Sequence, residues 1–194
     1  MSTVRRRFIL ALVVLAAAPL LWFIISAPPR VLRPAQSIID KAESLEVFRL
    51  APEDLRIGFP PQQAEPKEGF FETYPLKATI ASSELGSGYK ERAAAAIKAA
   101  IKRDPNEVTV CILKPGVAFR FTRGKQTATI FLCYYCGDGF VLVRDANGMS
   151  TYTRKYGFVR SNEALLGVIK EAFPNDADIA KLVAAKGELP ESHN

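Results

Sequence analysis

Histidine is almost absent from this 194-residue sequence, and its single copy, His193, is the penultimate residue. Histidine is the usual general base at neutral pH and a common ligand of transition metals. A histidine-dependent catalytic triad inside the fold is therefore excluded, and so is a metal site built on imidazole. With 48% hydrophobic and 24% charged residues, the chain is otherwise ordinary globular material, long enough for one domain with its own core.

A strong positive charge of the kind that attracts nucleic acid is also missing. The formal net charge is +6, but Arg5, Arg6 and Arg7 stand in an N-terminal segment that holds no acid. Without these three, 23 basic residues oppose 20 acidic ones, which leaves +3. Nucleic-acid-binding domains usually have a pI above about 9 and a clustered basic face, so we expect no nucleic-acid partner.

The longest apolar run, Phe8 to Ser26, contains no charged residue and is interrupted only by Pro19. A helix of this length covers roughly the 30 Å of a hydrocarbon core, so we predict a single transmembrane helix over 8–26 that acts as a signal anchor. By the positive-inside rule, residues 1–7 are cytoplasmic, and the rest of the chain lies outside the cytoplasmic (inner) membrane, in a periplasmic or extracellular position. A cleaved signal peptide with its site at Ala16 to Ala18 is the alternative, although the apolar run continues past that point.

The remainder divides into three parts. Residues 27–36 hold three prolines and two arginines, and we interpret them as a Pro-rich, extended linker outside the core. Residues 37–187 are predicted to form a single extracytoplasmic domain. Residues 188–194 are predicted to be a disordered tail.

Hydrophobic periodicity predicts the elements of this domain. Strands are predicted over 44–50, 74–81, 107–113, 117–123, 126–134, 139–145 and 149–153. The dipeptide Asn147-Gly148 predicts a tight hairpin. A helix is predicted from Tyr89 to Arg103, and two more near the C-terminus, the first capped by Ser161 or Asn162 and the second by Asn175. The fold class is therefore α+β: a mostly antiparallel, meander-like sheet of five to seven strands with packed helices, preceded by one transmembrane helix.

Cysteine is scarce, and two of its three copies stand in Cys133-Tyr-Tyr-Cys136-Gly137, with Cys111 upstream. A CxxCG turn can aim two thiolates at one zinc ion, but without histidine the ligand set would need Cys111 and Asp138. A thioredoxin-type pair needs its first cysteine at a helix N-terminus, whereas a strand is predicted after Gly137.

A structural role fits the predicted compartment better. Outside the cytosol, a disulfide from Cys111 to Cys133 or Cys136 would close a loop of about 22 to 25 residues and contribute about 3 kcal/mol. Pairing Cys133 with Cys136 is disfavoured unless the hairpin bends at this point, because residues i and i+3 of a straight strand lie on opposite faces about 10 Å apart. We expect a disulfide or buried thiols. A thiol-redox or metal-binding protein that uses Cys111, Cys133 and Cys136 is the alternative.

Part of this stretch resembles a known group of sequences. The order Cys111, Pro115, Phe119-Arg120-Phe121 and Leu132-Cys133-x-x-Cys136 resembles an uncharacterised bacterial family of exported, membrane-anchored proteins. The family pattern has Arg-His after the proline, where this chain has Gly116 and Val117, and this chain places tyrosines between the paired cysteines. The resemblance covers about residues 107–145 and implies an exported location but no activity. A metal or catalytic role that rests on the family histidine does not carry over.

No acidic residue stands between Glu107 and Asp138, a stretch that includes Arg120, Arg123 and Lys125. These three can form a cationic edge of the sheet that meets an anionic surface or an acidic protein partner. The simpler interpretation is a strand edge whose charges deter aggregation. Carboxylate pairs such as Glu84 with Glu91 have no distinctive spacing, so the sequence does not favour an enzyme.

Together these features predict a membrane-tethered, extracytoplasmic, non-catalytic binding or accessory domain whose partner the sequence does not identify. The membrane is the expected partner of the N-terminal helix. No catalytic residue, metal ligand set or cofactor is predicted.

Overall fold

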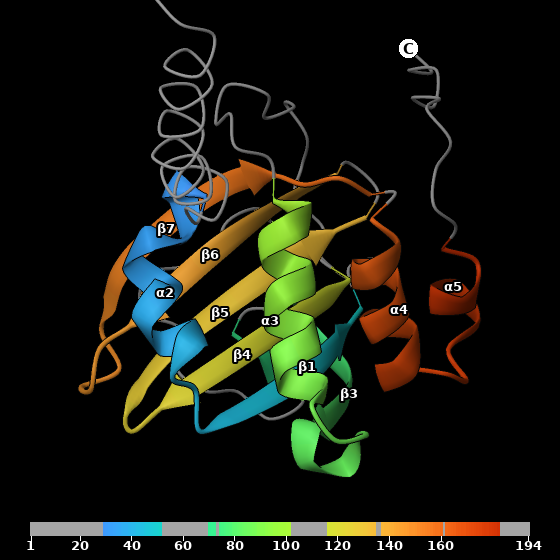
Figure 1. Cartoon of the computed structure of the whole chain (residues 1–194), viewed down its shortest axis with the longest axis horizontal. Coiled ribbons are helices and arrows are strands. Elements are labelled where there is room, and N and C mark those ends of the chain that lie inside the picture. The colour runs from blue at the N-terminus through green and yellow to red at the C-terminus, as the bar shows by residue number, and fades with distance from the viewer. Residues whose placement is uncertain are drawn as a thin grey trace, which may run out of the picture.

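One antiparallel sheet organises the part of the chain that the structure describes, with strand order β2-β3-β1-β4-β5-β6-β7 (Figure 1). The structure is a computed structural model, and it describes residues 29–51, 70–72, 74–101, 116–134, 137–160 and 162–182. The strands are β1 (Ser44–Leu50), β2 (Phe70–Phe71), β3 (Tyr74–Ala81), β4 (Val117–Arg123), β5 (Gln126–Cys133), β6 (Asp138–Arg144) and β7 (Ser150–Gly157). The predicted α+β class and the antiparallel sheet are confirmed.

The topology is a meander only in its second half. Strands β4 to β7 pair in sequence order, whereas β1 lies between β3 and β4 and pairs with both. Phe48, for example, stands opposite Thr79 on one side and Ala118 on the other. The first strand is therefore an interior strand of the sheet.

Most predicted strand positions are confirmed, with shifted ends. β5 stops at Cys133, and β7 runs to Gly157 because it keeps pairing with β6 as far as Asp138. The turn at Gly148 is longer than the predicted two-residue hairpin, since the Asp145 side chain accepts hydrogen bonds from the backbone of Asn147 and Met149. The predicted strand over 107–113 lies outside the described residues.

The described helices cover one face of the sheet. Figure 1 shows α2 (Arg33–Asp40), α3 (Tyr89–Ala100) and α4 (Glu163–Ala172) side by side across the near face, with the short α5 (Ala177–Ala180) beyond α4. Two 3-10 turns, η1 (Arg30–Leu32) and η3 (Ser82–Glu84), also lie within the described residues.

Helix ends follow local backbone interactions. α3 ends three residues before the predicted Arg103, because the backbone of Ile101 is extended and pairs with Phe158. Asn162 caps α4 as predicted, whereas Asp176 caps α5 in place of Asn175.

The predicted linker over 27–36 is wrong where the structure describes it. Pro34 occupies the first turn of α2, a position where a missing N–H costs nothing. Leu32 and Ala35 are fully buried, and Ile38 and Ile39 continue the same stripe into the core. Apolar residues at helical spacing therefore outweigh the proline content, and the domain begins at η1 and not at residue 37.

The sheet has an apolar cluster on each face. The larger one lies between the sheet and the helices and includes Val47, Phe119 and Ile130. The smaller one, on the opposite face, is rich in aromatic rings: Phe48, Phe71, Tyr74, Phe131 and Phe140. Alternate residues of β1, β4, β5 and β6 therefore serve two different cores.

No helix within the described ranges is long and apolar enough to cross a bilayer. The predicted transmembrane segment over 8–26 and the predicted tail over 188–194 lie outside these ranges.

Gly139 in β6 allows an unusually close contact between strands. Its neighbour across the ladder is Tyr156, whose hydroxyl donates a hydrogen bond of 2.9 Å to the carbonyl of Phe131. A β-carbon at position 139 would lie 2.6 Å from that hydroxyl and within the contact radius of the Phe131 carbonyl oxygen. Only glycine leaves enough space for the Tyr156 ring to pack over β6 at this position.

Gly139→Ala is expected to lower the free energy of unfolding by about 1–3 kcal/mol, because backbone and ring atoms must move apart. Gly167→Ala is the matched control, since position 167 lies in α4 with open space around it, and it should raise stability by about 0.5–1 kcal/mol. Urea unfolding measures both. A neutral Gly139→Ala would contradict the close contact.

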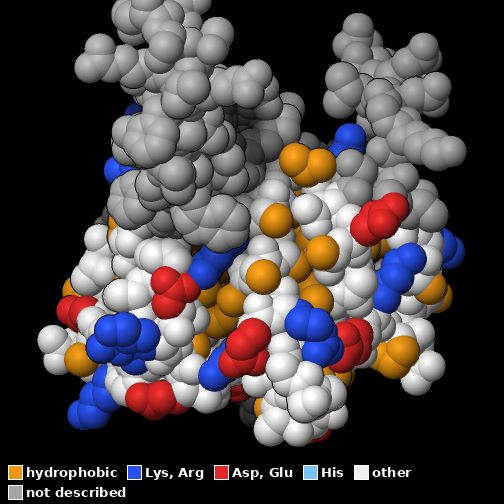
Figure 2. All heavy atoms as spheres, viewed as in Figure 1, with side chains coloured by type: hydrophobic (Ala, Val, Ile, Leu, Met, Phe, Trp, Pro, Cys, Tyr) orange, Lys and Arg blue, Asp and Glu red, His pale blue; other side chains and the backbone are white. Residues whose placement is uncertain are grey.

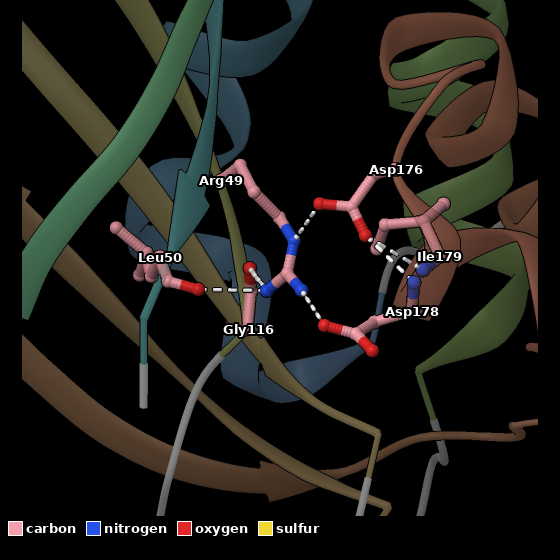
Figure 3. A network of polar contacts seen from close by, with 6 residues as sticks. All are labelled: Arg49, Leu50, Gly116, Asp176, Asp178 and Ile179. Atoms are coloured by element: carbon pink, nitrogen blue, oxygen red, sulfur yellow. Dashed lines mark hydrogen bonds and ion pairs between the residues drawn. The ribbon is translucent and has the colours of Figure 1, made fainter. Parts of the chain in front are cut away.

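Arg49, near the end of β1, joins three distant segments (Figure 3). Its Nε donates to Asp176 at 2.8 Å, and Nη2 donates to Asp178 at 3.2 Å. Nη1 donates to the backbone carbonyls of Leu50 and Gly116, at 2.7 and 3.1 Å. The Arg49 side chain is 6% exposed, so these acceptors compensate a charge removed from water. α5 is thus held against the ends of β1 and β4.

Asp176→Asn is expected to cost about 1–2 kcal/mol at neutral pH, because a charge-assisted bond to Arg49 becomes neutral. Burial raises the pKa of Asp176, but bonds from Arg49 and from the backbone of Ile179 and Asp178 outweigh it and leave the pKa below its ordinary value. A carboxyl with a lowered folded-state pKa contributes stability above its unfolded pKa near 4 and loses it as the pH falls further.

The stability difference between wild type and Asp176→Asn should therefore shrink below about pH 4, measured by urea unfolding as a function of pH. Asp178→Asn is the control, because that carboxylate is 66% exposed and its bond is longer. An equal loss in both variants would argue against a specific Arg49–Asp176 contact.

Candidate anion-binding site

The predicted cationic edge does not exist as a unit. β4 is an interior strand, so Arg120 lies on a sheet face and not at an edge. Arg123 ends β4 opposite Gln126, and Lys125 is exposed in the turn that follows. Because positions 120 and 123 differ by an odd number, their side chains leave the strand on opposite faces.

Arg120 instead takes part in a cluster on the face away from the helices. We call this cluster the arginine cradle: Arg120 of β4, Arg144 of β6 and the Glu72 carboxylate between them. Glu72 Oε2 lies 2.6 Å from Nη2 of Arg144, and Oε1 lies 3.4 Å from Nη2 of Arg120. The three side chains are 28%, 17% and 7% exposed, in the order Arg120, Arg144 and Glu72. Two guanidinium groups thus share one nearly buried carboxylate.

Strand register brings the two arginines together. β5 runs between β4 and β6, and it places Thr129 opposite Arg120 and Thr127 opposite Arg144. These small side chains on the same face leave room for both guanidinium groups to reach toward a common point. Glu72 comes from the short connection between β2 and β3.

Aromatic rings hold Arg120 in place. The rings of Phe48 and Phe71 stack with centroids 3.7 Å apart. The guanidinium carbon of Arg120 lies 4.3 Å from the Phe71 centroid and 5.1 Å from that of Phe48. A guanidinium over a ring gains cation–π stabilisation and loses rotational freedom, which fixes its orientation toward Glu72.

Electrostatics keep the cradle charged. Burial lowers the pKa of Arg120, and Arg144 lowers it further, while Glu72 and Glu46 oppose the shift. Arginine starts from so high a pKa that it remains protonated at neutral pH. The cradle therefore presents two permanent positive charges to any acidic group that reaches it.

No local pattern in the sequence predicts this site. Glu72, Arg120 and Arg144 stand far apart along the chain, and each is an ordinary charged residue in its own segment. Only the pairing of Thr127 with Arg144 and the path of the β2–β3 connection unite them. The sequence analysis singled out Arg120 as part of a cationic edge and missed its contacts with Glu72 and Arg144.

The thiol motif lies at the far end of the same sheet face. Cys133 ends β5 and is fully buried, whereas Cys111 and Cys136 lie outside the described residues. Cys133 stands opposite Asp138 in the β5–β6 ladder. Gly137 has a positive φ of 72°, and its N–H donates a hydrogen bond of 2.9 Å to the Cys133 carbonyl. The strand thus ends at Cys133, and Gly137 and Asp138 return beside it.

Buried polar groups surround Cys133. Asp138, 1% exposed, forms an ion pair of 3.1 Å with Lys155 of β7. The hydroxyl of Tyr74 is buried and has no hydrogen-bond partner among the described residues. Burial raises the pKa of Tyr74, and the nearby Cys133 adds to the shift, so the phenol is neutral. In the described part of the chain, no three donors of the kind that bind metals lie together.

The carboxylates considered as an acid/base pair have other contacts. Glu84 accepts a hydrogen bond from the backbone of Ala81, and Glu91 lies 3.5 Å from Lys90. Glu91 and Lys90 also line a groove of about 310 Å³ between α2 and α3, with Ile39, Ala94 and Ala95. Figure 2 views this helix face, where apolar atoms follow the helices and charged side chains surround them. The mixed charges of the groove give it no evident ligand preference.

Of the described sites, the arginine cradle has the most specific chemistry, because two fixed cations converge on a carboxylate. Comparisons of the chain with protein-family models, with curated proteins and with solved structures found no match.

Proposed function

We propose that the chain is a membrane-tethered, extracytoplasmic, non-catalytic binding domain that recognises an acidic side chain of a partner protein through the arginine cradle. The tether is the predicted helix over 8–26. The cradle formed by Arg120 and Arg144 is the observation that carries the proposal.

The position of η1 supports a short attachment to the membrane. Only residues 27–29 separate the predicted anchor from η1, whose Leu32 is buried in the core. A folded element that starts so close to the anchor would hold the domain near the bilayer surface. Such a domain meets neighbouring membrane proteins at high local concentration, so a modest intrinsic affinity is sufficient for binding.

The dimensions of the cradle favour a single carboxylate over an extended anionic surface. The planar fork of arginine matches a carboxylate, and the pair already holds one, that of Glu72. The stacked Phe48 and Phe71 rings are buried, so they hold Arg120 in place without forming part of the ligand surface. A single side-chain carboxylate of a protein matches the size of the cradle, whereas an anionic lipid surface would need basic groups spread over a wider area.

Arg144→Met should weaken binding of the full-length chain, in neutral-lipid nanodiscs, to immobilised poly-L-glutamate by about fivefold or more, since one arm of the cradle is lost. Arg154→Met is the matched control: it removes the same charge from an exposed position on β7 and should change the affinity less than about twofold. Biolayer interferometry measures both.

Equal weakening in the two variants would mean that net charge alone attracts the polymer, and the proposal would fail. A different result would identify a lipid as the ligand instead. In that case, the protein in nanodiscs would not bind poly-L-glutamate but would bind vesicles with anionic headgroups, and Arg144→Met would weaken this binding.

A thiol or metal protein remains a second candidate function, because the chain turns directly at the CxxCG motif. A tight turn with a left-handed glycine after the second cysteine is the form in which two thiolates can meet one ion or each other. The further ligand in this candidate would be Cys111.

Intact-mass measurement of non-reduced protein, together with elemental analysis, decides between these functions. We expect one internal disulfide among Cys111, Cys133 and Cys136 and no stoichiometric metal. Three reduced thiols with one zinc ion per chain, or a disulfide that cycles with a mild reductant, would establish the second candidate in place of the structural role.

A further inference from the structure

Glu72 has a backbone conformation that its residue type disfavours. Among the described residues it is the one non-glycine residue with positive φ, at 56°. A side chain in this left-handed region is strained, and the surroundings must compensate. The compensation here is the pair of ion contacts to Arg120 and Arg144, since the conformation points the carboxylate between them.

The element that presents Glu72 has few contacts of its own within the sheet. β2 consists of two residues, and its register with β3 is limited to Phe70 opposite Pro75 and Phe71 opposite Tyr74. It stands at the end of the strand order. The backbone beside Glu72 is nevertheless held, because the adjacent Phe71 is buried and stacks on Phe48. Exchange at the cradle therefore means rotation of the Glu72 side chain alone.

Both arginines are held by contacts that do not involve Glu72. Nη1 of Arg144 donates to the Gly148 carbonyl at 2.9 Å. Arg120 lies over the rings of Phe71 and Phe48, which stay in place when only the Glu72 side chain moves. If the Glu72 carboxylate leaves, these contacts keep the two guanidinium groups near their present positions, ready for another carboxylate.

From these three observations we propose that Glu72 is a built-in competitor: its carboxylate occupies the arginine cradle until an acidic side chain of the partner replaces it. The inference rests on the proposed function of the cradle. The Glu72 side chain then acts as an autoinhibitory latch, which lowers the apparent affinity for weak acidic ligands. The competing possibility is a permanent structural ion pair that no external carboxylate replaces.

Removal of the competitor separates these possibilities. Full-length Glu72→Ala, in neutral-lipid nanodiscs, is expected to bind poly-L-glutamate at least about tenfold more tightly than wild type, because the binding-competent fraction rises. The double variant Glu72→Ala/Arg144→Met should lose this gain. Glu91→Ala, which removes an exposed carboxylate outside the cradle, is the control for net charge and should bind like wild type.

Thermal unfolding in the presence of acetate provides a second measurement, which stays informative if Glu72→Ala is less stable than wild type. Acetate should raise the melting temperature of Glu72→Ala above the value in sodium chloride of equal ionic strength, and it should leave wild type and Glu91→Ala unchanged. Glu72→Gln, which keeps the side-chain shape, is expected to respond in the same direction.

The outcomes are distinct. Unchanged affinity and no acetate response in both Glu72 variants, with Arg144-dependent binding in wild type, would overturn the latch and leave the proposed function standing. No Arg144-dependent binding in any variant would overturn both. Tighter binding that survives Arg144→Met, or that Glu91→Ala reproduces, would also overturn the latch.

Discussion

Burial of both faces of the sheet is the constraint on which the rest of the structure depends. Along β4, β5 and β6, successive side chains enter two different cores, one under the helices and one rich in aromatic rings. A charged side chain on such a strand is largely shielded from water, so it needs a partner of opposite charge or a set of hydrogen-bonding groups. Arg49, Asp138 and the arginine cradle each satisfy this requirement in a different way.

The two faces consequently differ in role. On the helix face, Arg49 binds acceptors from β1, β4 and the α5 region and so completes a scaffold. On the opposite face, the acceptor of Arg120 and Arg144 comes from a short connection at the end of the sheet. The acceptors of Arg49 include two backbone carbonyls, which are fixed, whereas the acceptor in the cradle is a single side chain, which can rotate away. This difference is the physical basis for placing the binding site on the cradle.

Local sequence signals predicted much of the fold. Period-two alternation located β1, β3, β4 and β5, and Asn162 was recognised as the cap of α4. These features depend on residues close together in the chain, which a pattern can register. The proline-rich start of α2 was misinterpreted, because composition was given more weight than the spacing of Leu32, Ala35 and Ile39.

The amino-acid sequence by itself determined which strands and helices form and which residues of each strand are apolar, because alternation, helical spacing and capping act over a few neighbours. Only the tertiary structure decided what those residues meet. Glu72 reaches Arg120 and Arg144 because Phe71 and Tyr74, on either side of the β2–β3 connection, pack against Phe131 on the face away from the helices. The register of β5 also aligns two threonines between the arginines. Such long-range pairing results from the summed packing of whole elements, which no local segment encodes alone.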